Sequence, residues 1–108
     1  MKWNSPEEKV KRQKDGKNNR TVRLVIYGKV QGVFFRSNLK IVADNYSVTG
    51  WTRNLADGTV EALVQGTDAN VKRVIDWCHV GPPSAQVTSV ETTELDADII
   101  YDSFAVLH

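Results

Sequence analysis

Residues 28–36 (GKVQGVFFR) are of types that can bind an anion. Gly28 and Gly32 lie between an apolar run at 22–27, typical of a strand, and a stretch at 35–46 whose apolar residues have helical spacing. A tight turn into a helix can direct backbone N–H groups toward one oxyanion, and the helix N-terminus adds a positive dipole. Arg36 would add a planar guanidinium that matches two phosphate or carboxylate oxygens.

The same residues also fit a purely structural turn. Glycines in such a turn often serve backbone geometry alone, and an arginine in a first helical turn is often a solvated surface residue. The segment lacks the Gly-Lys-Ser/Thr of a nucleotide-binding P-loop and the G-x-G-x-x-G of a dinucleotide site. These residues alone therefore leave an anion site and a plain turn as open alternatives.

Asn54 is the second candidate for chemistry. Residues 48–54 and 59–65 have strand composition, and Asp57-Gly58 between them is a turn signal, so we predict a hairpin. Asn54 ends the first of these strands, and its side-chain amide would point across the 28–36 turn if that strand end lies beside it. Asparagine is also a common turn residue, which is the structural alternative.

Composition limits the class of protein. With 108 residues and 41% hydrophobic content, the chain is long enough for one domain with a modest core. No run approaches the ~18 apolar residues of a membrane span, and Cys78 is the single cysteine, which excludes an internal disulfide or a multi-cysteine metal site. We expect a monomeric, cytoplasmic protein without a membrane segment.

Charge divides the chain in two. Residues 1–20 have a net charge of +4, whereas residues 21–108 have a net charge of −3. We predict a basic, loop-like or disordered extension over 1–20 and a folded domain over 21–108. The alternative is a nucleic-acid-binding module with a basic arm and with Trp51 and Tyr27 as stacking residues. The acidic body and the lack of an aromatic RNA-binding signature argue against nucleic acid as a partner.

The remaining pattern completes the fold. Thr67 and Asp68 predict the start of a second helix, whose core stripe ends at Cys78, so this thiol is interpreted as a small buried hydrophobe.

A strand with a bulge follows near Val87 and Val90. Residues 94–103 are predicted to be an acidic turn region whose carboxylates form a solvated face and not a metal site. Phe104 and Val106 predict a short last strand. The order predicts an α+β ferredoxin-like sandwich, βαββαβ plus a short C-terminal strand, with two helices on one face of a mainly antiparallel sheet.

Two long motifs resemble the signatures of the acylphosphatase family. They are Ile26-x-Gly28-x-Val30-Gln31-Gly32-Val33-x-Phe35-Arg36 and Gly50-Trp51-Thr52-Arg53-Asn54-x-x-x-Gly58-x-Val60. The closing Phe104-x-Val106 also resembles the end of that family, so the resemblance covers residues 22–107. Thr52 departs from the pattern, since the family more often has a small apolar residue there, and this puts local packing in question.

The resemblance implies hydrolysis of acyl phosphates to a carboxylate and inorganic phosphate, without metal, cofactor or covalent intermediate. By position, Arg36 matches the phosphate-binding arginine and Asn54 the catalytic asparagine. The loop whose backbone amides hold the phosphate corresponds to Val30, Gln31, Gly32, Val33 and Phe34. The expected partners are a small acyl phosphate and inorganic phosphate as product or inhibitor. Carbamoyl phosphate, or an acyl phosphate carried on a protein, stays open as the substrate.

Overall fold

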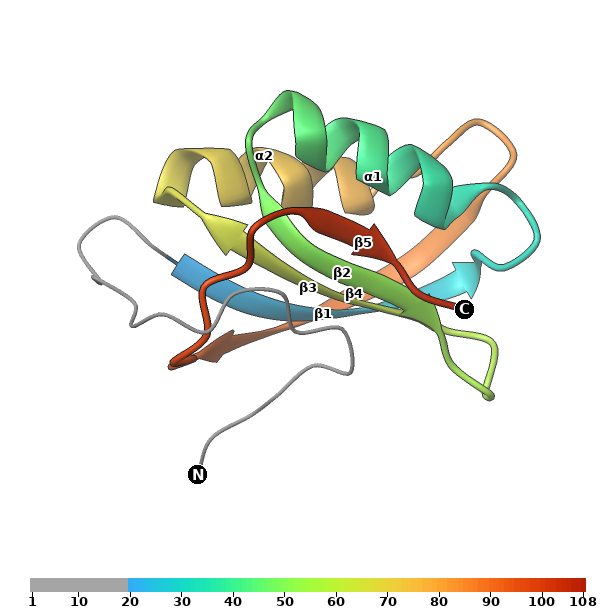
Figure 1. Cartoon of the computed structure of the whole chain (residues 1–108). Helices are drawn as coiled ribbons and strands as arrows, with labels where there is room; N and C mark the ends of the chain where they lie inside the picture. Colours follow the sequence, from blue (N-terminus) through green and yellow to red (C-terminus); the bar gives the residue numbers. More distant parts are fainter. Residues whose placement is uncertain (1–19) are drawn as a thin grey trace.

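The computed structural model describes residues 20–108 (Figure 1). The elements follow the order β1 (Arg20–Lys29), α1 (Phe35–Asn45), β2 (Thr49–Asn54), β3 (Val60–Gly66), α2 (Asp68–Cys78), β4 (Gln86–Leu95) and β5 (Phe104–Val106). Every predicted helix and strand is present, with ends that differ by a few residues from the sequence pattern. The predicted extension, apart from Arg20, lies outside the described residues, and Arg20 itself is the first residue of β1.

The fold has two layers. One layer is a five-stranded sheet of order β4-β1-β3-β2-β5, and the other consists of the two helices, which cover the same face of the sheet (Figure 1). The pairs β1–β3, β1–β4 and β2–β3 are antiparallel, whereas β5 is parallel to β2. The β1–β4 register shifts between Tyr27 and Gly28, so the bulge predicted near Val87 is confirmed. The ferredoxin-like sandwich with a short extra strand is confirmed.

The main core lies between the sheet and the helices. Residues Val60, Ala62 and Val64 of β3 point into it, as their alternation predicted. From α2, the predicted stripe of Val71, Val74, Ile75 and Cys78 is buried, and Thr67 caps this helix by accepting a hydrogen bond from the Asn70 amide. Pro82 and Pro83 follow the helix end, where backbone N–H groups are no longer available to continue it.

A second, smaller cluster lies on the other face of the sheet. It comprises Trp51, Leu63, Ile99, Tyr101 and Leu107, all at most 9% exposed. The side chain of Gln65 fixes the covering segment, because it donates to the Ile99 carbonyl (2.9 Å) and accepts from the Tyr101 amide (2.9 Å). The prediction of a solvated acidic turn over 94–103 is therefore wrong in part. The carboxylates are exposed, but the segment crosses this face of the sheet and buries the side chains of Ile99 and Tyr101 against it.

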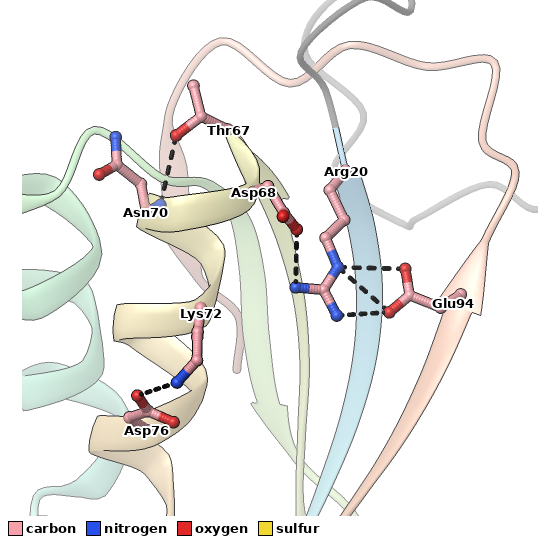
Figure 2. Close-up of polar contacts among 7 residues, drawn as sticks. All are labelled: Arg20, Thr67, Asp68, Asn70, Lys72, Asp76 and Glu94. Carbon is pink, nitrogen blue, oxygen red and sulfur yellow. Dashed lines mark hydrogen bonds and ion pairs between the residues drawn. The ribbon is translucent and has the colours of Figure 1, made fainter.

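Arg20 joins three elements near the start of β1 (Figure 2). Its guanidinium contacts Glu94 of β4 at 2.6 Å and Asp68 of α2 at 3.2 Å. Glu94 belongs to β4 and not to a turn, so the predicted turn begins after Leu95. The hydrogen bond from Arg20 lowers the pKa of the Glu94 carboxyl below its ordinary value.

Candidate active site

The two motifs meet in one pocket. Its volume is about 340 Å3, within the range of small-molecule sites, and residues of the β1–α1 loop and of the end of β2 line it. Its lining includes Val30, Gly32, Phe34, Arg36, Asn54 and Val106. The structure thus brings together the arginine, the asparagine and parts of the loop over residues 30–34, hereafter the 30–34 loop.

The backbone of the 30–34 loop has the alternation of an anion-binding nest. Gly32 (φ 75°) and Phe34 (φ 64°) are left-handed, whereas Val33 between them has a negative φ. Such alternation turns successive N–H groups toward the same side. Within residues 20–108, no backbone carbonyl accepts from the amides of Gly32, Val33 or Phe34. These donors lie beside the N-terminus of α1, where the helix dipole also favours an anion.

Side chains outside the nest hold the loop in place. Gln31 Nε2 donates to the carbonyls of Leu55 (2.7 Å) and Thr59 (2.8 Å), which fastens the loop to the β2–β3 turn. Ser84 Oγ donates to the Val33 carbonyl at 2.9 Å, from the segment before β4. The side chain of Gln31 is therefore a tether and not a ligand donor, and any contribution of this residue to anion binding comes from its backbone.

Arg36 is held from the far end of the chain. Its Nη1 donates to the Leu107 carbonyl at 2.7 Å, which uses one of five guanidinium donors and fixes the side chain over the pocket. Leu107 is in turn anchored, because its amide donates to the Thr52 carbonyl at 2.8 Å. Arg36 is half-buried, not a fully solvated surface residue as one sequence alternative had it.

Asn54 is exposed at the end of β2, and the turn beyond it is stabilised by another residue. Asp57 Oδ1 accepts from both the amide (3.1 Å) and the hydroxyl (2.6 Å) of Thr59, and the Leu55 amide donates to the Thr59 carbonyl. The Asn54 side chain forms no hydrogen bond with any of residues 20–108, so it has no such role in stabilising the turn. The geometry leaves the Asn54 amide available to the pocket.

Other candidate groups lie elsewhere. Cys78 is fully buried, and burial raises the pKa of its thiol, so the interpretation as a small hydrophobe is confirmed. In the described part of the chain, no three His, Cys, Asp or Glu side chains group as metal ligands. None of the helices over 20–108 has the length and apolar character needed to cross a membrane.

Trp51 does not offer a stacking surface for nucleic acid. Its side chain is fully buried under residues 99–101, and the Arg53 guanidinium lies 5.2 Å from its ring centroid. The nucleic-acid alternative therefore loses one of its two aromatic residues.

Thr52, the departure from the family pattern, is also fully buried. Its hydroxyl donates a hydrogen bond to the Glu61 carbonyl at 2.9 Å, so this buried polar atom has a partner.

Comparison with known proteins shows the family of this chain. The acylphosphatase family model matches residues 22–106, which is nearly all of the described chain. The chain belongs to the acylphosphatase family. The family predicted from the two motifs is thus confirmed.

Individual acylphosphatases are similar over most of their length. The chain is 43% identical over 102 residues to an acylphosphatase of Pyrobaculum calidifontis, covering 92% of this chain and 93% of that relative. It is 45% identical over 78 residues to an acylphosphatase of Rubrobacter xylanophilus, covering 72% and 71%. The solved structure of an acylphosphatase from Coxiella burnetii superposes with a TM-score of 0.79 at 34% identity, covering 83% of this chain and 94% of that one.

Sequence reasoning missed the contribution of the last residues to the pocket. Val106 and His108 line it, and the Leu107 carbonyl orients Arg36. The Phe104-x-Val106 pattern predicts a short strand and resembles the end of the family, but neither observation assigns these residues to the pocket. No local sequence pattern indicates this contribution, because it depends on the parallel pairing of β5 with β2, which is a property of the whole sheet.

Proposed function

We propose that this chain hydrolyses acyl phosphates in the pocket between the 30–34 loop and the end of β2. Arg36 and the loop amides hold the phosphoryl group, and Asn54 orients the attacking water. The observation that supports this is the meeting, in one small pocket, of two motifs that are separated in sequence by a whole helix. Membership of the acylphosphatase family supplies the reaction class, which is that of a hydrolase.

The chemistry needs few groups. An acyl phosphate expels a carboxylate whose conjugate acid has a pKa of about 4–5, so the leaving group departs at neutral pH without a protein general acid. Phosphoryl transfer through a loose transition state depends mainly on positioning and charge stabilisation. The nest amides and the Arg36 guanidinium are donors suited to the non-bridging phosphoryl oxygens.

The proposed step balances without any further reactant. Water held by the Asn54 amide attacks phosphorus in line with the bond to the acyl oxygen. That P–O bond breaks and its electron pair leaves with the carboxylate. The water proton passes to a phosphoryl oxygen, so a dianionic acyl phosphate and water give a carboxylate and dihydrogen phosphate. Asn54 has no basic atom and therefore acts by orientation alone.

A hydrolysis assay with benzoyl phosphate tests the proposal. The assay is run with a metal chelator present and with inorganic phosphate as competitor. We expect turnover that is insensitive to chelator and is inhibited competitively by phosphate, because product and substrate share the same donors. A requirement for Mg2+, or the absence of phosphate inhibition, would contradict the proposal.

A further inference from the structure

Two consecutive phenylalanines at the pocket have opposite environments. Phe35 is 1% exposed and its ring packs against Trp77, with centroids 5.3 Å apart. Phe34 is 75% exposed and lines the pocket. Phe35 anchors the start of α1 in the core, whereas the Phe34 ring contributes little to the core.

The backbone of Phe34 makes its side chain unexpected. Its φ of 64° is left-handed, a conformation that is strained for a residue with a Cβ and that glycine adopts freely. The nest requires this conformation whatever the side chain is. A large ring is thus kept in water, at a position where glycine would serve the backbone better, and a contact with a ligand would account for it.

We propose that Phe34, together with Val106, forms a subsite for the acyl group and gives the enzyme a preference for aromatic and bulky apolar acyl groups. This inference rests on the proposed function, because Arg36 and the 30–34 loop must hold the phosphoryl end. The backbone amides of the loop face the phosphoryl group, so the acyl group lies toward the apolar side chains of the lining, which are Phe34 of the loop and Val106 of β5.

The size of the preference follows from ring contacts. An aromatic acyl group can stack in an offset or edge-to-face arrangement on the Phe34 ring, which an acetyl group cannot do. An aromatic pair of this kind corresponds to about a three- to tenfold difference in binding. The subsite therefore separates benzoyl from acetyl phosphate, although both present the same phosphoryl group to Arg36.

The first experiment compares kcat/KM for benzoyl phosphate and acetyl phosphate in the wild type, Phe34→Gly and Val80→Ala. Val80 is a matched control, since it is 71% exposed but lies after α2 and outside the pocket lining. We expect Phe34→Gly to lower the benzoyl-to-acetyl ratio by about three- to tenfold and Val80→Ala to leave it unchanged. An equal loss on both substrates would overturn the inference, because Phe34 would then act only through the loop backbone.

The second experiment does not depend on turnover. Calorimetry measures the binding of benzoylphosphonate and acetylphosphonate, which cannot be hydrolysed, to the wild type, Phe34→Gly and Phe34→Leu. We expect the wild type to prefer benzoylphosphonate, Phe34→Gly to lose that preference and Phe34→Leu to retain part of it.

The two experiments separate two kinds of failure. If the wild type hydrolyses neither acyl phosphate, the proposed function fails while the phosphonates still test the subsite. Equal affinity of the wild type for both phosphonates would overturn the subsite itself.

Discussion

The side-chain amide of Gln31 donates a 2.7 Å hydrogen bond to the carbonyl of Leu55, the residue directly after Asn54. The same nitrogen donates to the Thr59 carbonyl at 2.8 Å. One side chain therefore sets the position of the 30–34 loop, which we propose binds the phosphoryl group, relative to the strand end that carries the proposed water-holding group. The distance between the two halves of the site depends on this tether.

Removing the tether should lower turnover more than phosphate affinity. Gln31→Ala leaves the nest residues in place but frees the loop to move relative to Asn54, and a displacement of this kind costs about 10- to 100-fold in rate. We expect kcat for benzoyl phosphate to fall by that factor, with a smaller change in the inhibition constant of phosphate. Gln31→Glu, which directs a carboxylate at two carbonyl oxygens, should be at least as impaired. Wild-type kcat in both variants would show that the tether does not position the site.

Arg36→Ala should remove phosphate binding. The side chain is the charged donor among the pocket residues that we assign to the phosphoryl group, and its loss should raise the inhibition constant of phosphate by about 10- to 100-fold. The far-UV circular dichroism should stay that of the wild type. The control is Arg73→Ala, which removes an exposed arginine of α2 that lies over the Tyr46 ring. Strong phosphate inhibition in Arg36→Ala would exclude the assigned role.

Asn54→Ala should separate binding from turnover. Since we assign Asn54 to the water and not to the phosphate, kcat should fall by about 100-fold or more while the inhibition constant of phosphate stays near the wild-type value. Asn45→Ala, at the exposed end of α1, serves as the control. If affinity and turnover fall together, Asn54 binds the phosphoryl group instead.

The contact between Arg20 and Glu94 should make stability depend on pH. The folded state lowers the pKa of Glu94, so the contact stabilises the fold above the ordinary pKa of the carboxyl and is lost as the pH falls through the lower folded value. Both side chains are partly solvated, so Arg20→Ala should cost about 1 kcal/mol or less in the free energy of unfolding at pH 7.

Urea unfolding at a series of pH values measures this effect. The difference between wild type and Arg20→Ala should shrink once Glu94 is protonated in both states. Lys72→Ala, which removes an exposed pair with Asp76 inside α2 (Figure 2), is the control for an ion pair that joins no elements. A difference that persists unchanged at low pH would mean that Arg20 stabilises the fold by packing rather than by charge.

The sequence was informative where one local period decides the structure. The alternation of Val60, Ala62 and Val64 and the stripe that ends at Cys78 each follow from one element that buries one face. The burial of Trp51 did not follow, because it depends on Ile99 and Tyr101 crossing the sheet, and the carboxylates around them favoured a solvated turn.

Contacts that depend on how the strands pair could not be predicted either, because the spacing of residues within one strand does not show which strands are neighbours. Glu61 is 3% exposed and pairs with Arg23 (2.6 Å) and Arg53 (2.7 Å) from the two neighbouring strands, which no spacing within one strand indicates. At the site, the two motifs predicted the pocket, but the bond from Arg36 to the Leu107 carbonyl joins residues 71 positions apart. Only the parallel placement of β5 beside β2 brings that carbonyl to the guanidinium.

Because strand β5 has only three residues, the protein should lose activity on warming before its main core unfolds. Leu107 follows it and keeps its place through one backbone hydrogen bond to Thr52 and through the small cluster around Tyr101. Short edge strands open locally at a lower free energy than the central strands of a sheet. Local opening at Val106 and Leu107 would release the Arg36 side chain while Phe104, at the start of β5, stays in the main core. Amide hydrogen exchange at Leu107 should therefore follow the loss of activity on warming, at temperatures below those at which the main core unfolds.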